Sequence, residues 1–330
     1  MTRAELLELL EEARHAPSVH NIQPARWRLE GSVLELLGDP GRRLPVADPS
    51  GHDVRVSLGA AAEGMAIALA ARGMTADVHV ERGGDIVAGA AAVARIRTRP
   101  GAEPDLLGAA VTRRATFRGA FASAPADAID AVARDAQPAG DVLIRDAAKI
   151  RDVAKLADQA QGEFLLDPAY WRETWRWLRL SPTDPNWKRD GLNAEALALS
   201  GFERVMGGVL MQPAAFELMR KIGLAGALTS ERSKIETASA LLIFTAPNGE
   251  DPFVTGRAFY RRWLQVTAAG LALCPMSVLA DSKRANAEIR RTFAVPAERR
   301  IVNVLRIGAP PPGFPSALTP RLPASELVLA

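Results

Sequence analysis

The chain has 330 residues, a formal net charge of +3 and a sequence pI of about 9.3. Hydrophobic residues make up 48% and charged residues 24% of it, which is typical of a folded globular protein and excludes disorder on the scale of the whole chain. The positive charge is small, scattered and mostly arginine, which argues against a nucleic-acid partner and indicates a solvated surface, with a minority of arginines left to hold an anionic ligand.

Cysteine and histidine usage limits the chemistry further. Cys274 is the only cysteine, so no internal disulfide can form, and no Cys/His cluster has the spacing of a zinc site, so we expect no metal. The first residues have the pattern of an amphipathic helix rather than of a signal peptide. The most apolar stretch, residues 56–71, is interrupted by Glu63 and is too short to span a bilayer. The sequence therefore predicts a cytoplasmic protein with no membrane partner.

Hydrophobic periodicity predicts alternating helices and strands in the first 145 residues. Apolar and polar residues alternate on both sides of Gly31-Ser32, which is typical of a β-hairpin. The expected elements are, in chain order, a helix over 3–14, a hairpin over 27–37, a helix over 54–72, strands over 75–81 and 92–98, a short helix over 106–113, a helix over 125–136 and a strand over 141–145.

Residues 147–234 differ from what precedes them. They have helical periodicity, but they are interrupted by a Pro/Asp/Gly-rich piece at 181–191 and a Gly/Met-rich piece at 206–226, and they contain four of the six tryptophans. Two interpretations stay open: a lid over a ligand, or an insertion whose tryptophans simply pack in its interior. After it the expected elements are a strand over 238–246, a helix over 252–269, a mostly helical segment over 278–293, a strand over 301–307 and a Pro-rich tail from 310.

The two longest predicted helices outside the insertion align with each other without gaps. Gly59 and Gly73 match Gly256 and Gly270 at an offset of 197 residues in both cases. Each helix is followed by a short extended segment and then a second strand. This pattern indicates an internal duplication, in which two copies of one α+β unit bury the same helix face against each other, as in a twofold dimer.

Common enzyme motifs are missing from the sequence. There is no Gly-x-Gly-x-x-Gly turn after a strand, no Gly-Lys-Ser/Thr phosphate loop, no Gly-x-Ser-x-Gly elbow and no zinc-protease helix. Dinucleotide-binding Rossmann enzymes, P-loop nucleotide hydrolases, serine hydrolases of the α/β type and zinc proteases therefore have no support.

Three segments carry polar groups in ligand-like combinations. Residues 16–27 form a Pro-flanked loop rich in Ser, Asn and Gln, suited to the imide edge of a flavin; a helix end followed by an ordinary turn is the alternative. Residues 112–118 hold three arginines and two threonines, suited to phosphate, or else form a solvated basic loop. Arg321, within Thr-Pro-Arg near the end of the chain, could join them or lie on the surface.

Taken in order, these segments resemble the nitroreductase-like superfamily. Residues 17–27 are similar to its Pro-Ser-x-x-Asn-x-Gln-Pro-Trp motif, with Ala25 in place of the tryptophan, and residues 113–118 look like its Arg-Arg-x-Ser/Thr-x-Arg/Lys motif. Residues 270–277 resemble the segment that passes the flavin N5. The basic motif follows the Ser-Asn-Gln motif here, the reverse of the usual order, as in the Acg-like subgroup, in which one chain mimics the usual homodimer.

The resemblance implies an α+β, nitroreductase-like fold, internally duplicated as a pseudo-dimer with central antiparallel or mixed sheets flanked by helices and a helical lid insertion. We expect a first half over 1–110 and a second half over 111–330, which includes the insertion at about 147–234. The amino-terminal half lacks its own arginine loop, so one of the two pseudo-symmetric sites is expected to have decayed, leaving one FMN per chain.

The resemblance also assigns roles in binding FMN. Arg114 and Thr116 would meet the phosphate, with help from Arg113 and with Arg321 closing on it, and Arg118 would lie near N1 and the C2 carbonyl. Polar side chains of the first motif would face the pyrimidine ring or the ribityl chain, and the segment after residue 274 would pass N5, its nearest backbone being that of residue 276 or 277. These residues are Ser18, Asn21 and Gln23, and Pro275, Met276 and Ser277.

Two functions follow from the resemblance. One is an oxidoreductase in which NAD(P)H reduces FMN and a small-molecule electron acceptor, such as a nitroaromatic or a quinone, is then reduced in a ping-pong cycle. The other is a non-catalytic protein that binds or sequesters FMN under a closed lid. No side chain is a clear acid or base, with His20 the only nearby candidate. A pseudo-dimeric chain could act as a monomer or pair into a homodimer.

Overall fold

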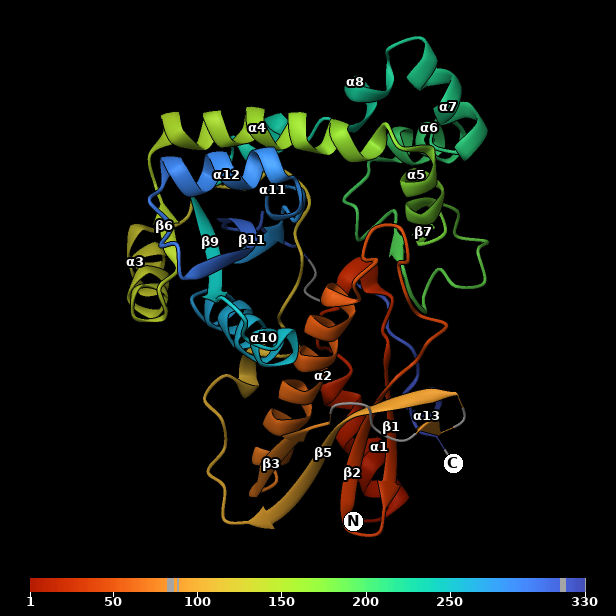
Figure 1. Ribbon diagram of the computed structural model, residues 1–330, viewed down its shortest axis with the longest axis vertical. Helices are drawn as coiled ribbons and strands as arrows, with labels where there is room; N and C mark the ends of the chain where they lie inside the picture. Colours follow the sequence, from red (N-terminus) through yellow and green to blue (C-terminus); the bar gives the residue numbers. More distant parts are fainter. Residues whose placement is uncertain (82–85, 88, 315–318, 330) are drawn as a thin grey trace.

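The computed structural model describes residues 1–81, 86–87, 89–314 and 319–329, and it contains two antiparallel sheets with two long helices between them (Figure 1). The predicted α+β class is confirmed. The first sheet has the strand order β1-β2-β5-β3, with β4 also paired to β5, and the second has the order β6-β9-β11-β10. The strands are β1 (Ala25–Glu30), β2 (Val33–Gly38), β3 (Met74–Val80), β4 (Ile86–Val87), β5 (Ala90–Pro100), β6 (Val142–Ile144), β9 (Ala240–Pro247), β10 (Ala272–Pro275) and β11 (Arg299–Gly308).

The two sheets, each taken with its helices, have the same order of elements along the chain and the same strand order. In each sheet a helix precedes the first strand, and a long helix follows the second strand. The third strand then lies at the edge of the sheet, and the last strand pairs between the second and the third. In chain order, α1-β1-β2-α2-β3-β5 corresponds to α3-β6-β9-α10-β10-β11. The helices are α1 (Arg3–Ala13), α2 (His52–Ala70), α3 (Ala126–Ala136) and α10 (Pro252–Ala268).

Helices α2 and α10 cross at closest approach through two glycines. A Cβ on Gly59 would lie 1.9 Å from the carbonyl oxygen of Phe253, and a Cβ on Gly256 would lie 2.0 Å from that of Val56. Because residues 56 and 59 correspond to 253 and 256 at the offset of 197, the contact is reciprocal, as at an isologous interface. Only glycine permits this backbone separation.

The second sheet is covered on both faces, which explains why β9 reads as a continuous apolar run rather than as an alternating strand. Leu241 and Ile243 pack in one core beside α4 (Ala147–Leu165) and α12 (Lys283–Thr292), while Leu242 and Phe244 pack in another with α3 and α10. The first sheet packs α1 and α2 on one face, around Trp27. Helices α11 (Val278–Asp281) and α12 (Lys283–Thr292) precede β11.

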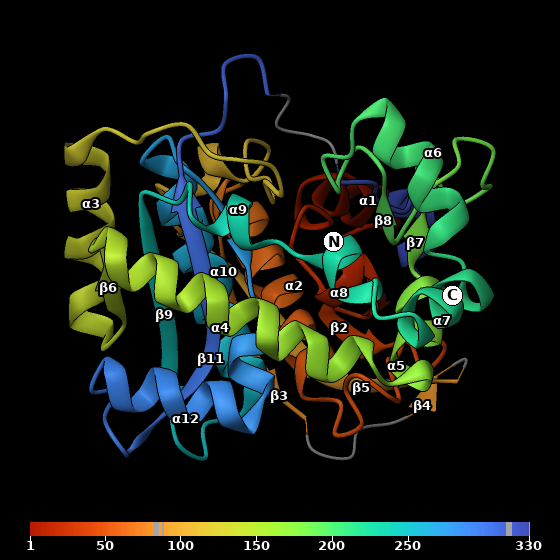
Figure 2. The same cartoon turned by 90° about the horizontal axis from the view of Figure 1, so that it is seen from above.

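The segment between β6 and β9 is the mostly helical insertion. Its long α4 runs along the second sheet and leads to the small helices beyond it (Figure 2). Trp171 and Phe216 stack there with ring centroids 4.0 Å apart, so this tryptophan packs inside the insertion. Its elements are α4 (Ala147–Leu165), α5 (Pro168–Trp175), β7 (Leu178–Arg179), β8 (Leu192–Asn193), α6 (Gly201–Leu210), α7 (Pro213–Lys221), α8 (Ala225–Thr229) and α9 (Arg232–Ile235).

Two features differ from the sequence-based expectation. The helix expected over 106–113 is only a 3-10 turn, η2 (Gly108–Ala110), which is too short to form the cooperative hydrogen bonds of an α-helix. The tail, which was expected to belong to the second half, packs on the first: Leu322 and Leu327 lie in its core, and Val328 bridges to Trp27 beside α13 (Ala324–Leu327). In the described ranges no helix is long and apolar enough to cross a membrane.

Candidate functional site

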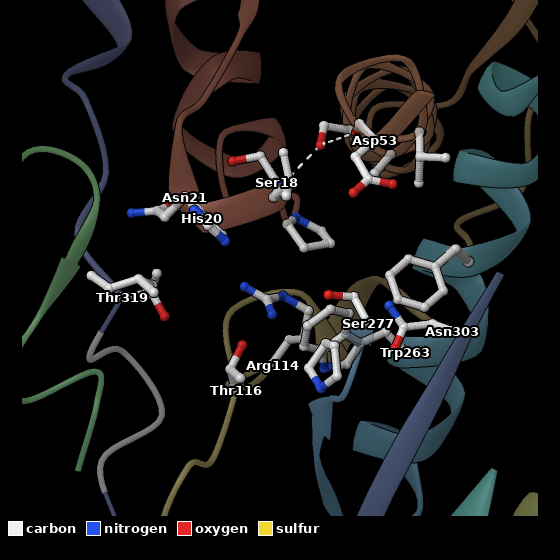
Figure 3. Close-up of a pocket in the computed structure, with 18 of the residues that line it drawn as sticks. Ser18, His20, Asn21, Asp53, Arg114, Thr116, Trp263, Ser277, Asn303 and Thr319 are labelled. Carbon is white, nitrogen blue, oxygen red and sulfur yellow. Dashed lines mark hydrogen bonds between the residues drawn. The ribbon is translucent and has the colours of Figure 1, made fainter. Parts of the chain in front are cut away.

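A cavity of about 280 Å³ lies where the two parts of the chain and the tail meet (Figure 3). Its wall combines the loop after α1, the start of α2, the loop before α3, the middle of α10, the end of β10, and the tail. Leu192 of the insertion completes it. The polar or charged residues in the wall are Ser18, His20, Asn21, Asp53, Ser57, Arg114, Thr116, Arg118, Ser277, Asn303, Thr319 and Arg321.

The Asn21 loop, residues 18–23, has an unusual backbone. His20, Asn21 and Gln23 have φ values of 44°, 54° and 51°, a left-handed conformation that costs free energy for residues with a side chain. Two hydrogen bonds hold this conformation. Ser18 Oγ accepts one from the Gln23 N–H at 2.9 Å, and the Val19 N–H donates one to Ser57 Oγ of α2 at 3.0 Å. The loop is therefore fixed against the helix that forms the cavity wall.

Asn21 joins three segments that are distant in sequence. Its amide nitrogen donates to the carbonyls of Gly191 in the insertion and Pro320 in the tail, at 3.0 and 2.9 Å. Its Oδ1 accepts a hydrogen bond from Arg321 at 2.8 Å. Asn21 thus lines the cavity while its side chain is already satisfied by protein groups.

Arg114 is the buried cation of the cavity. It is 6% exposed, its guanidinium carbon lies 4.7 Å from the ring centroid of Trp263, and its Nη2 donates to the His15 carbonyl at 3.2 Å. The buried Nε and Nη1 have no hydrogen-bond partner among the described residues. Burial lowers the pKa of this guanidinium, which stays charged. A buried arginine with two unused donors is a strong site for an anion.

Arg321 and Arg118 add further positive charge to the wall. Arg321 donates to the carbonyls of Arg14 and His15 at the end of α1, at 2.7 and 3.1 Å, and burial beside Arg114 lowers its pKa to about 9. Arg118 donates to the Ala196 carbonyl at 2.9 Å, and burial lowers its pKa. Both remain cations at neutral pH.

Three hydrogen-bonding groups next to these arginines are buried without a partner among the described residues. They are the Tyr260 hydroxyl, the Trp263 indole N–H and Nδ1 of His20. Burial, with a smaller contribution from Arg118, lowers the pKa of His20 to about 4, so its imidazole is neutral. Trp263 and His20 line the cavity, so their unpaired groups offer polar contacts to a ligand.

The end of β10 forms another part of the wall. Pro275 and Ser277 line the cavity, and Thr116 bridges to Leu273 of β10, which places the arginine loop beside this strand. Met276 does not line the cavity: its N–H donates to the Val304 carbonyl at 2.8 Å, and its side chain is buried in the core of the second sheet.

The structure thus brings most of the predicted site residues together, but three of them lie outside the cavity wall. Arg113 is exposed outside the cavity wall, because the turn after Ala110 directs its side chain back to the Ala109 carbonyl. Gln23 has both ends of its amide occupied by backbone, since Nε2 donates to Arg189 and Oε1 accepts from Leu322. Met276 is the third. The predicted residues that do line the cavity are Ser18, Asn21, Arg114, Thr116, Arg118, Pro275, Ser277 and Arg321.

Several wall residues were not identified from the sequence. Asp53 and Ser57 lie on α2, Trp263 on α10 and Asn303 on β11, beside a register shift in that strand. A single polar residue in a helix or a strand carries no local pattern, and only the packing of the two parts reveals it. In the described part of the chain no group of three or more His, Cys, Asp or Glu residues is placed to hold a metal.

Comparisons with known proteins find two relatives in one species. Rv3131 of Mycobacterium tuberculosis is 31% identical over 170 residues, which cover 51% of this chain and 49% of Rv3131. The acg protein of the same species is 25% identical over 341 residues, covering 96% of this chain and 92% of acg. The names of both give NAD(P)H nitroreductase as a proposed activity. No family model matches.

These matches agree with the resemblance to the nitroreductase-like superfamily found in the sequence. The full-length match to acg is consistent with the predicted Acg-like subgroup, whereas the chain spans about half the length of Rv3131. Among solved structures, the FMN-dependent nitroreductase NfnB of Mycobacterium smegmatis, in complex with NADPH, is 19% identical and covers 66% of this chain and 94% of its own, with a TM-score of 0.36. This score is too low to support the fold, which rests on the chain's own sheets.

Proposed function

We propose that this protein is an FMN-dependent oxidoreductase that transfers electrons from NAD(P)H to a nitroaromatic, a quinone or a similar small molecule. The observation that carries the proposal is Arg114, whose buried guanidinium has two unused donors in the cavity wall. The phosphate of FMN would satisfy them. Bound FMN supplies the two-electron chemistry that the cavity's own side chains lack.

The cavity wall offers suitable groups both to the phosphate and to the ring system of FMN. Arg114 and Thr116 would hold the phosphate, and Arg321, fixed by the end of α1, would add positive charge behind it. Arg118 would stabilise the negative charge that a reduced flavin carries near N1. The polar side chains of Ser18 and Asn21 and the backbone at Pro275–Ser277 would border the ring system.

We further infer that the chain arose by internal duplication, with halves at about 1–110 and 111–330 and the insertion inside the second. The same strand order in both sheets and the reciprocal contacts of Gly59 and Gly256 support this. The cavity draws on both halves, so one chain suffices to build one FMN site. A monomer or a homodimer, and a location in the cytoplasm, remain predictions.

A second candidate function is an FMN-sequestering protein, and the attachment of the insertion favours it. Gly191 N–H donates to the Asn21 carbonyl at 3.2 Å while Asn21 donates back to Gly191. Glu173 accepts hydrogen bonds from the N–H groups of Val46 and Ala47, and Arg42 donates to Asp190. An insertion tied in this way could exclude nicotinamide from the cavity.

Anaerobic reduction of the purified, FMN-loaded protein separates the two candidates. The oxidoreductase should lose its visible flavin absorbance when mixed with excess NADPH or NADH, and menadione should restore it. Persistent colour with both nicotinamides, together with complete bleaching by dithionite, would favour the sequestering protein. Failure to bind FMN would contradict both.

A further inference from the structure

The carboxylate of Asp53 points into the cavity and faces Ser277 across it (Figure 3). Asp53 lies in the first turn of α2, in the first half of the chain, and Ser277 follows β10 in the second. Among the described residues, no hydrogen bond or cation stabilises the Asp53 carboxylate. It is therefore open to a ligand on the same side as the backbone of Pro275–Ser277.

The surroundings of Asp53 keep a proton on it near neutral pH. Burial, together with the negative charges of Asp281 on α11 and Asp48 in the loop before α2, raises its pKa to about 7. Burial likewise raises the pKa of Asp281 to about 6. From α5 of the insertion, Tyr170 faces both carboxyl groups, and its own pKa is raised to about 12 by burial and by their charges. The neighbouring negative charges thus favour the protonated form of Asp53.

We propose that Asp53 is the proton donor to the electron acceptor bound in this cavity. The proposal rests on the oxidoreductase function above. Two-electron reduction of a quinone or a nitro group adds a hydride equivalent and a proton. The O–H bond of Asp53 breaks, its proton goes to an oxygen of the acceptor, and the carboxylate that remains regains a proton from water. A general acid with a pKa near the working pH serves this step best.

The test follows reoxidation of the flavin rather than its reduction by nicotinamide. FMN-loaded protein is reduced anaerobically with dithionite and mixed with menadione in a stopped-flow instrument from pH 5 to 9, in H₂O and in D₂O. The wild-type rate should fall as the pH rises through about 7 and show a solvent isotope effect. In Asp53→Asn, reoxidation at pH 6 should be about a hundredfold slower, independent of pH and without the isotope effect.

Two further variants make the result specific. Asp281→Asn removes a neighbouring negative charge and should move the fall in rate to lower pH. Asp135→Asn, an exposed carboxylate on α3, should behave like the wild type. An Asp53→Asn profile that matches the wild type would overturn the proposal and leave the proposed function intact. If the wild type binds no FMN, or if its flavin reoxidises no faster than free FMN, the proposed function itself fails.

The thermal stability of the apoprotein tests independently whether Asp53 carries a proton. Since the pKa of Asp53 is higher in the folded chain than in the unfolded chain, the stability that it contributes is full below about pH 4 and is lost as the pH rises through 7. The melting temperature of Asp53→Asn apoprotein should therefore exceed that of the wild type by a margin that grows from pH 5 to 8. A margin that does not change with pH would show that Asp53 is already ionised, and would overturn the proposal.

Discussion

Arg114 stacks on Trp263 of α10 in the wall of the cavity. The guanidinium carbon lies 4.7 Å from the indole centroid, which fixes the plane of the arginine, while two of its nitrogens have no partner among the described residues. The stacked ring lowers the entropy cost of binding an anion, because the arginine is held before the anion arrives.

Arg114→Ala should weaken FMN binding at least about a hundredfold, since two charge-assisted hydrogen bonds to the phosphate are lost. The neighbouring Arg113 is exposed and outside the cavity, which makes Arg113→Ala a matched control with the same change of charge. Titration of the apoprotein with FMN, followed by flavin fluorescence, measures both. Equal losses in the two variants would mean that only the overall charge of the loop matters.

Gly256→Ala should destabilise the protein by about 1–3 kcal/mol or more, because the added methyl group would meet the Val56 carbonyl at the crossing of α2 and α10. Gly162→Ala in α4 has open space around the added methyl group and should be neutral or stabilising. Denaturant unfolding of both variants gives the comparison. A Gly256→Ala protein as stable as the wild type would refute the close helix contact.

His20→Asn should flatten the acid dependence of stability. The folded chain holds the His20 pKa at about 4, below its usual 6.5, so the stability that the neutral imidazole contributes is full above about pH 6.5 and is lost as the pH falls through 4. The loss amounts to about 3 kcal/mol. Asparagine also tolerates the φ of 44° at this position. Thermal unfolding of the apoprotein from pH 7 to 4 checks it, with His79→Asn, at an exposed position, as control.

Arg42→Ala should loosen the insertion and speed the release of FMN about tenfold. Arg42 donates to the Ile22 carbonyl at 2.7 Å and to Asp190 at 3.0 Å, and so connects the end of the Asn21 loop to the insertion. The adjacent Arg43 is exposed and provides the control Arg43→Ala. Recovery of flavin fluorescence after dilution measures release. Identical rates in the two variants would show that this connection does not retain the cofactor.

The helices and strands could be predicted from the sequence wherever the hydrophobic periodicity of the side chains agrees with the conformation that the backbone requires. The glycines at 59 and 256 were noticed as a repeat, and the structure adds the physical reason, a helix crossing that excludes any Cβ. The helix expected over 106–113 failed because three residues of turn satisfied the local hydrogen bonds.

The site was only partly predictable, for a different reason. Asn21 and Gln23 look equivalent in the sequence, and only contacts from residues 189 and 322 turn Gln23 away from the cavity wall. Asp53 is one acidic residue at the start of a helix, a common place for such residues. Its role in the wall depends on β10, more than 200 residues away, so no local pattern could reveal it.

Titration of the apoprotein with FMN and with riboflavin, which lacks the phosphate, tests the central claim most directly. We predict saturation at one FMN per chain and binding of riboflavin at least about a hundredfold weaker, because only FMN supplies the anion that Arg114 requires. No saturable binding of FMN, or equal affinity for the two flavins, would contradict the account.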